Sequence, residues 1–348
     1  MFMAGKRQHT LPRFLLKGFA SRESGDQRFT WVFRRERPPF ETNITNVGAE
    51  GDFYGSAGKG SLDDEITRRE GEFASLIDAL RRSQAQVPDG SVQLLASFVL
   101  HVAARSSNVR DAFAEGADRV FGTLASAVST PEGAAKVTKE HLRSHPKTIR
   151  KMVREKLTER LGRRPTRNEL AIAEARAKPT FLAAIDEVAP AIYWQAAEVM
   201  RRLQSEIEPA IKRAHNTALP RVMSKAGRRE QLLRKLVWTV VSFGEPVILG
   251  DIGPIALCDD GRYDRLLADM EKVQGIVLPI SHHQAVVGSS GKVDLLPALL
   301  NQASAELSRD FFVSSTREVD PRLHQVLSAR AAILSDEEWV DFERDLLE

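Results

Sequence analysis

The first polar side chain of the sequence that could do chemistry is His9. It precedes Leu11 and Pro12, so it is expected in extended backbone just ahead of the first helix. A histidine there could act as a general acid or base near neutral pH, or it could bind a metal ion. The alternative is an ordinary surface histidine close to the N-terminus.

Arg105 is the second such side chain. It follows His101 by one helical turn in "LHVAARSSNVR", on a face next to the apolar stripe of the expected helix. A guanidinium at the edge of a core needs a carboxylate or phosphate partner, because burying an unpaired charge is costly. That partner could be a bound phosphate, or an acid of the preceding helix in a structural salt bridge.

Acidic side chains gather near the start of the first long helix expected, at Asp63, Asp64, Glu65 and Glu70. Carboxylate oxygens suit magnesium, so two of these acids could hold a divalent metal ion. The alternative is that they complement the dipole at the N-terminus of the helix.

Asp251 follows the hydrophobic run "FGEPVILG" and is therefore expected at the end of a strand, beside a cleft. Gly250 and Gly253 allow close backbone approach at this point. His282 and His283, in "PISHH", end the next strand-like run and could lie beside it. Neighbouring residues of a strand point to opposite faces, so at most one of the two could join a site with Asp251. A turn capped by the aspartate is the alternative.

Residues 139–178 form a basic stretch with 13 Lys and Arg against 5 Glu. Within it, "LTERLGRRPTRNELA" is expected to form a helix, a turn and a second helix that Thr166 and Glu169 begin with a capping box. This segment is similar to the third-region helical segment of bacterial sigma factors. A solvated helical face is the alternative to contacts with nucleic-acid phosphates. The candidate phosphate-binding residues are Lys147, Arg150, Lys151, Arg154, Arg163, Arg164 and Arg167.

The composition is that of an ordinary globular protein, with 348 residues, 42% apolar and 28% charged residues, and a net charge of +3. The one cysteine excludes an intrachain disulfide and a cysteine-rich zinc site, and it favours a reducing, cytoplasmic location. No run is apolar enough to span a membrane, so no membrane association is expected. The last fifteen residues, "LSDEEWVDFERDLLE", carry seven acids and one arginine, and they could bind a protein partner.

The element pattern predicts a mostly helical α+β fold. Strand-like "RFTWVFRR", which "ERPPFE" should stop, precedes helices expected at 61–82 and 91–113. Further helices, separated at "STPE", "SHPK", "GRRPT", "AKPT" and "AGRRE", reach about residue 236. Two β-rich runs, joined by a helical connection or loop at 261–274, a strand in "SRDFFVSST" and two helices then end the chain. Strands from both ends should share one small sheet around a helical middle block. The expected parts are residues 1–115, 116–235 and 236–348.

Several of these segments together resemble one bacterial family, the domain-of-unknown-function family 4238. "HTLPRFLLKGF" matches its His-x-x-Pro-x-Phe-x-Leu-x-x-Phe opening, and "NVGAEGDFYG", "LDDEITRREGEFA", "LASFVLHVAARSSNVR", "VILGDIGPIAL" and "LPISHHQAVV" match later motifs in order. Gly250 departs from the family's usual serine, and one residue is inserted before Pro254. The resemblance implies that His9, Glu70, Arg105 and Asp251 form one recurring set, which we expect to converge on a single site.

Two kinds of function follow from these expectations. The first is a hydrolase-like enzyme acting on a phosphate-bearing substrate, which is nucleic acid or a nucleotide. A role in bacterial defence or toxicity would fit such an enzyme. His9 would be its acid or base, Arg105 its charge clamp, and Glu70 and Asp251 its orienting or magnesium-binding carboxylates. The second is a non-catalytic nucleic-acid-binding or sensing module, in which the same residues form a buried structural network. A protein-interaction scaffold using the acidic C-terminus is a further alternative.

Overall fold

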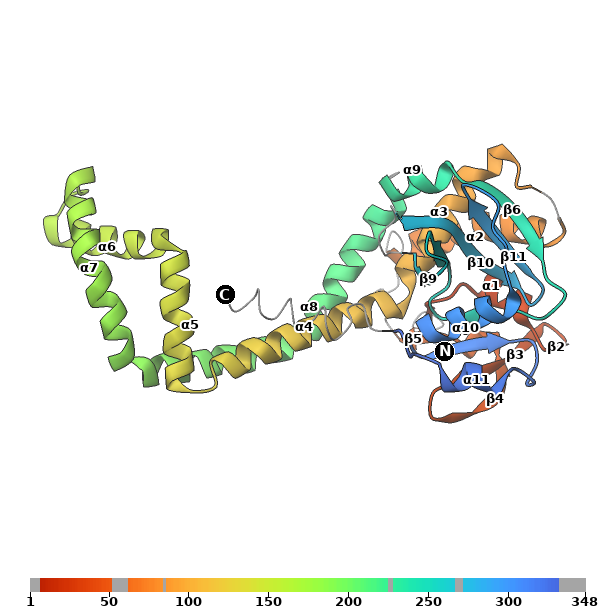
Figure 1. Cartoon of the computed structure of the whole chain (residues 1–348), viewed down its shortest axis with the longest axis horizontal. Coiled ribbons are helices and arrows are strands. Elements are labelled where there is room, and N and C mark those ends of the chain that lie inside the picture. The colour runs from red at the N-terminus through yellow and green to blue at the C-terminus, as the bar shows by residue number, and fades with distance from the viewer. Residues whose placement is uncertain (1–6, 52–61, 84–85, 225–227, 267–271, 332–348) are drawn as a thin grey trace, which may run out of the picture. The chain divides into compact units, whose positions relative to one another are not determined.

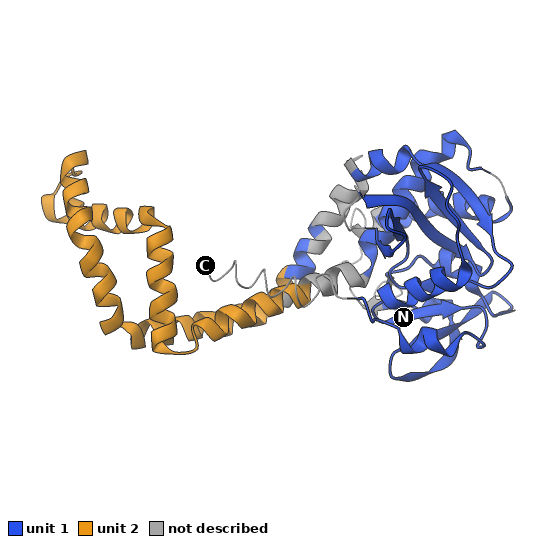
Figure 2. Ribbon diagram, viewed as in Figure 1, with its two compact units in different colours: residues 1–113, 211–333 blue, residues 114–210, 334–348 orange. Residues whose placement is uncertain are grey.

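A computed structural model describes residues 7–51, 62–83, 86–224, 228–266 and 272–331 of the chain. The chain divides into two compact units (Figure 2). The first, unit 1, comprises residues 1–113 and 211–333, and the second, unit 2, comprises residues 114–210 and 334–348. In the described part of the chain, no helix is both long and apolar enough to cross a membrane.

One antiparallel sheet of unit 1 joins strands from both ends of the chain (Figure 1). Its order is β2-β3-β12-β7, with β4 paired to the other edge of β3. Phe312 lies opposite Phe33 in this sheet, and their rings stack with centroids 4.7 Å apart. The prediction of an α+β fold with a sheet shared by the two ends is therefore confirmed. The strands are β2 (Arg22–Ser24), β3 (Gln27–Arg34), β4 (Arg37–Asn43), β7 (Leu249–Gly250) and β12 (Phe311–Ser314).

Strand β4 corrects one expectation, because "ERPPFE" does not stop the sheet. Glu36 takes a left-handed conformation with φ of 62°, so the chain turns back and continues as β4. Pro38 and Pro39 are tolerated there for two reasons. Among the described strands β4 pairs only with β3 and so forms an edge, and the pairing register shifts between Val32 and Arg34, so the two prolines lie in an irregularity of the ladder.

A second antiparallel sheet of unit 1 has the order β6-β11-β10-β8-β9, and a short pair joins β1 to β5. Residues 263–265 were expected in a helical connection or loop, and they form its edge strand β9 instead. Its strands are β6 (Val237–Ser242), β8 (Ile255–Cys258), β9 (Tyr263–Arg265), β10 (Val273–Ser281) and β11 (Gln284–Ser289). The short pair is β1 (Arg7–His9) and β5 (Ala49–Gly51).

The helices of unit 1 carry the predicted apolar stripes, but the helix expected at 91–113 is divided. Helix α3 ends at Arg105, because Ser106 is extended with ψ of 133°, and α4 (Ser107–Ala127) begins after it. Of the two helices expected at the C-terminus, the short α11 is described, and residues 332–348 lie outside the described part. The helices are α1 (Arg13–Leu16), η1 (Lys17–Phe19), η2 (Ile44–Asn46), α2 (Leu62–Arg81), α3 (Asp89–Arg105), α9 (Arg228–Arg234), α10 (Pro297–Leu307) and α11 (Pro321–Gln325).

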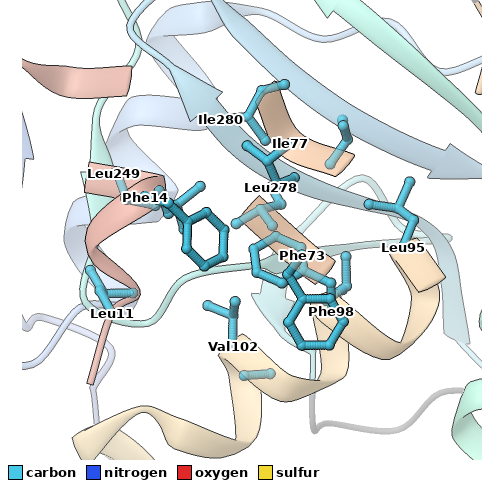
Figure 3. Packing of buried hydrophobic residues seen from close by; sticks show 14 of the residues in the cluster. Leu11, Phe14, Phe73, Ile77, Leu95, Phe98, Val102, Leu249, Leu278 and Ile280 are labelled. Carbon is cyan, nitrogen blue, oxygen red and sulfur yellow. The ribbon is translucent and has the colours of Figure 1, made fainter. Parts of the chain in front are cut away.

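The main core of unit 1 packs α1, α2 and α3 against strand β10 (Figure 3). The Phe98 ring lies 5.5 Å from that of Phe14 and 5.1 Å from that of Phe73. The apolar residues of the opening motif, among them Leu16 and Phe19, are buried in this core. The spacing in "HTLPRFLLKGF" is therefore a packing pattern that fixes the chain directly after His9.

Unit 2 contains helices throughout its described part. Helices α5, α6 and α7 contact one another, and Ile149, Val153 and Leu170 form a small core between α6 and α7. The predicted capping box of Thr166 and Glu169 is present. Helix α7 continues through Pro179, where "AKPT" was expected to break it. The helices that lie wholly or partly in this unit are α4, α5 (Pro131–Ser144), α6 (Pro146–Leu161), α7 (Arg167–Glu187) and α8 (Ala189–Ser224).

Candidate functional site

Arg105 is the centre of the candidate site, and it is buried at the C-terminal end of α3. Its Nη1 donates to Glu70 Oε1 on α2 and to His101 Nε2 at 2.9 Å. Its Nη2 donates to the main-chain oxygen of His9 at 2.5 Å. One guanidinium thus joins α3 to the preceding helix and to strand β1.

These contacts supply the partner that a buried guanidinium needs. The Arg105 side chain is only 3% exposed, and the carboxylate that pairs with it comes from α2, as the structural alternative predicted. A charge held in this way contributes to a unique arrangement of elements. It is already hydrogen-bonded on two nitrogens, so it is poorly placed to clamp a substrate phosphate.

His9 lies in extended backbone, as expected, at the end of β1. It meets Arg105 through its main-chain oxygen, while its ring Nε2 lies 3.0 Å from the Thr45 oxygen. Burial lowers the pKa of the ring below its usual value, and the charges of Arg13 and Arg105 lower it further, whereas the bond to Thr45 and the charge of Glu70 oppose the shift. The ring is therefore neutral at neutral pH.

His101 is part of the same cluster and is almost fully buried. Its ring packs against Phe73, with centroids 5.3 Å apart. Burial lowers its pKa well below the usual value, and the positive charges of Arg105 and Arg69 act in the same direction. The neutral ring accepts the Arg105 hydrogen bond at Nε2, so Nδ1 carries the hydrogen, and within the described structure this buried Nδ1 has no hydrogen-bond partner.

Asp251 is fully buried directly after β7. Its carboxylate accepts hydrogen bonds from the main-chain N–H groups of Arg309, Asp310 and Phe311, at 2.9, 2.7 and 3.2 Å. Its main-chain oxygen accepts from Ser106 Oγ at 3.0 Å. Asp251 therefore fixes the loop before β12 and connects it to the end of α3.

The glycines around Asp251 allow this close packing. Gly253 has a φ of 74°, and a Cβ there would lie 2.6 Å from Val102 Cγ1 on α3. A Cβ at Gly250 would lie 2.0 Å from Ser308 Oγ, so any side chain at this position would collide with Ser308. Gly250 thus fits the packing of this particular chain.

The four predicted residues meet around the end of α3, though not as an open set of side chains. Glu70 and Arg105 bind each other, His9 joins them through its backbone, and Asp251 is linked through Ser106. The catalytic roles assigned to them stay predictions. The side chains of residues 63–65 lie outside the described part, and among the described side chains no group of three or more His, Cys, Asp or Glu suits a metal ion.

His282 and His283 do not extend a strand beside Asp251. They form the two-residue turn between β10 and β11, and their rings lie together with centroids 4.6 Å apart. His282 Nδ1 bonds to the Gly18 oxygen and His283 Nδ1 to the Phe243 oxygen. The expectation that the rings take opposite faces is wrong, because the pair belongs to a turn.

Sequence reasoning missed Arg81, a partly buried arginine that also joins several elements. Its Nε donates to the Ile280 oxygen at 2.8 Å, and its Nη2 donates to the oxygens of Phe14 and Leu15, both at 3.0 Å. It connects the end of α2 to α1 and β10. Its place one turn after Ile77 in the apolar stripe and its spacing from Asp78, to which its Nη1 donates at 3.1 Å, were the available signals. Its other partners are main-chain oxygens, which carry no residue-type pattern.

The predicted phosphate-binding residues of unit 2 are exposed on α6, on α7 and in the turn between them. Two of them have acidic partners. Arg150 lies 3.8 Å from Glu174, and Arg163 lies 2.7 Å from Glu169, whose pKa the Arg163 hydrogen bond lowers to about 2. Within the described residues, five have no ion pair, and these are Lys147, Lys151, Arg154, Arg164 and Arg167.

Three of these free cations follow one face of α6. Lys147, Lys151 and Arg154 are spaced by four and three residues, which places them in one row along the helix. Ile149 and Val153 point to the opposite side, where they pack against α7. The row is therefore a solvent-facing positive surface, which we call the α6 basic row.

The comparisons with known proteins identify the family. Residues 7–295 match the family described as "Protein of unknown function (DUF4238)", and the chain belongs to it. The matched range includes the helical residues 116–235, for which the sequence motifs offered no counterpart. Neither the curated proteins nor the solved structures gave a match.

Proposed function

We propose that this protein binds the phosphate backbone of nucleic acid through the α6 basic row, with a structural role for the Arg105 network. The observation that carries the proposal is the contrast in ion pairing. Lys147, Lys151 and Arg154 are exposed and have no acidic partner within the described residues, whereas Arg105 is buried and bound. A cytoplasmic location, expected from the single cysteine, is part of the proposal.

The positive charge of residues 139–178 is the physical basis of the proposed binding. Cations in a row neutralise successive phosphates and release condensed counterions, which makes binding depend steeply on salt. Residues 139–178 carry an excess of eight positive charges, from 13 Lys and Arg against 5 Glu, so the local potential attracts a polyanion. Contacts of this kind position a protein on nucleic acid without reading its sequence.

Fluorescence anisotropy with a labelled DNA duplex and a matched RNA duplex tests the proposal. The triple variant K147Q/K151Q/R154Q is expected to lose affinity and about three units of the salt slope, roughly one for each phosphate contact. The matched control is K156Q/R201Q/R202Q, which removes the same charge from exposed cations that already pair with Glu159 and Glu198. Equal loss in both variants would reduce the effect to net charge and contradict the proposal.

A second candidate function is hydrolysis of a phosphate-bearing substrate with His9 as general base. It is favoured by a half-buried ring whose lowered pKa keeps it neutral, beside the half-exposed carboxylate of Glu70. In this version Arg105 and Asp251 are positioning residues, because internal bonds occupy both. A divalent metal such as magnesium would have to come with the substrate or from residues outside the described part.

The variant H9A separates the two candidates. An enzyme loses turnover of a nucleic-acid or nucleotide substrate while its melting temperature stays unchanged. If wild type has no such turnover, or if H9A retains it, the hydrolase candidate is wrong. Duplex binding by the α6 basic row is expected to be the same in H9A and wild type.

A further inference from the structure

We propose that His282 and His283 form a binding site for one first-row divalent transition-metal ion, such as Zn²⁺ or Ni²⁺. The proposal concerns unit 1 and is independent of nucleic-acid binding. It is carried by the tautomer, the orientation and the spacing of the two rings in the β10–β11 turn.

The hydrogen bonds of the rings fix their tautomers. His282 Nδ1 lies 3.2 Å from the Gly18 oxygen, and His283 Nδ1 lies 3.1 Å from the Phe243 oxygen. A carbonyl oxygen only accepts, so each Nδ1 carries a hydrogen, and in the neutral form of the ring Nε2 presents a lone pair. This is the arrangement of metal-binding histidines, which donate their second ring N–H to a carbonyl or carboxylate.

Both Nε2 atoms are available to a ligand. Among the described residues neither Nε2 atom makes a hydrogen bond, and neither is fully buried. Both atoms therefore reach solvent. Neutral imidazole nitrogen suits zinc, copper and nickel, whereas magnesium prefers oxygen. The site therefore selects for this class of ion.

The spacing of the rings matches two ligands of one ion. Two imidazoles bound through Nε2 at about 2.0–2.1 Å to a shared ion have centroids about 4.5 Å apart when the ligands stand at a right angle and about 5.2 Å apart when they are tetrahedral. The centroids of His282 and His283 are 4.6 Å apart, with the planes tilted by 56°. Water would complete the coordination, because the described residues offer no third protein ligand.

The turn is held rigidly, so the two ligands are arranged in advance. The main-chain N–H of His282 donates to Gly18 at 3.0 Å, and the main-chain oxygens of His282 and His283 accept from Val247 and Phe243, both at 2.8 Å. Gly18 permits the approach, since a Cβ there would lie 2.1 Å from the Ile280 oxygen. Little side-chain freedom therefore remains to be lost on binding.

A second histidine pair provides the internal control. His141 and His145 are four residues apart at the end of α5, with rings stacked 4.4 Å apart. His145 Nδ1 is near the His141 oxygen and Ser144 Oγ, but His141 has no hydrogen bond from its ring in the described structure. This pair is near in space yet lacks the two fixed tautomers.

The test is an NMR titration of the tag-free full-length protein with Zn²⁺, observing the imidazole nitrogens. The Nε2 resonances of His282 and His283 are expected to shift together and to saturate at one ion. In H283N the amide can keep the hydrogen bond to the Phe243 oxygen, but it removes the second imidazole. His282 should then bind Zn²⁺ at least about tenfold more weakly, since even changes outside the first coordination shell cost this much at metal sites. H145N should leave the titration of His282 and His283 unchanged, and the metal-free melting temperature of each variant checks folding.

Three results would overturn the proposal. The first is that the Nε2 resonances of His282 and His283 do not shift in about a tenfold excess of Zn²⁺ over the protein. The second is an unchanged affinity of His282 in H283N. The third is loss of the His282 shift in H145N, which would assign the binding to the helical pair.

Discussion

Two regions of the molecule use positively charged side chains in opposite ways. In unit 1, Arg105 is 3% exposed and binds a carboxylate, an imidazole and a main-chain oxygen. In unit 2, Lys147, Lys151 and Arg154 are exposed, and they have no acidic partner within the described residues. A buried charge has to be paired, whereas an exposed one keeps its hydration and can exchange it for a ligand.

The comparison separates stability from binding. Removing a bound, buried charge leaves its partners unsatisfied, so the expected effect is on folding. Removing an exposed, unpaired charge should change folding little and change the affinity for a polyanion. Variants in the two regions should therefore give opposite patterns.

The largest expected effect is that of R105L. It removes the bonds to Glu70, His101 and His9, and a broken buried pair typically costs about 3–5 kcal/mol of unfolding free energy. Urea unfolding followed by tryptophan fluorescence measures it, because Trp238 is buried in the same core. The control R201L removes an exposed arginine and should cost under about 1 kcal/mol. A value for R105L no larger than that of the control would contradict the structural role.

D251N should have the next largest effect. Both carboxylate oxygens of Asp251 accept from the N–H groups of residues 309–311. An asparagine has one oxygen, and its NH₂ group would face a donor, so we expect the unfolding free energy to fall by about 2–3 kcal/mol. Hydrogen exchange should accelerate at the amides of residues 309–311. D260N is the matched control, since Asp260 is an exposed cap of Arg262. Unchanged exchange at residues 309–311 in D251N would show that the carboxylate does not hold this loop.

His101 gives a pH dependence to the buried network. The folded protein keeps its ring neutral, whereas the unfolded chain protonates it near the usual pKa of 6.5. The unfolded state then binds more protons, so the unfolding free energy falls as pH drops below 6.5, by up to about 1.4 kcal/mol per pH unit. H101Q, whose amide oxygen can still accept from Arg105, should lose this part of the acid sensitivity. Identical pH profiles for H101Q and wild type would exclude His101 as the source.

A smaller and local effect is expected in unit 2 from T166A. Thr166 caps α7 by accepting from the Glu169 N–H, and loss of such a cap costs about 1 kcal/mol. The exchange protection of the first turn of α7 reports it. T158A is the control, because Thr158 lies inside α6 and bonds only to the oxygen of Arg154. If T166A changes protection no more than T158A does, the cap contributes little to the turn that carries Arg164 and Arg167.

Some of this arrangement was predictable from the residues alone. The apolar stripe through Phe73 and Ile77 gave α2, the capping box gave the start of α7, and the strands at both ends gave the shared sheet. The cost of burying Arg105 unpaired predicted a partner for it, with a bound phosphate and an acid of the preceding helix as alternatives, and Glu70 is that acid. Each of these conclusions depends on side-chain types at fixed spacing.

The tertiary partners of Asp251 and Arg81 were beyond prediction, because they are main-chain groups whose identity leaves no trace in the residue types. The break at Ser106 was missed for a related reason. The apolar pattern continues into α4, and the end of α3 is set by the extended backbone of Ser106, whose hydroxyl bonds to Asp251. Tertiary contacts fix these features, so only the fold reveals them.

The salt dependence of duplex binding tests the central contrast most directly. Anisotropy titrations over a range of salt concentrations should give a log–log slope about three units shallower for K147Q/K151Q/R154Q than for wild type, with an unchanged melting temperature. R105L should show the reverse, a lowered melting temperature and the wild-type slope wherever it remains folded. Equal slopes for the triple variant and wild type would contradict the account.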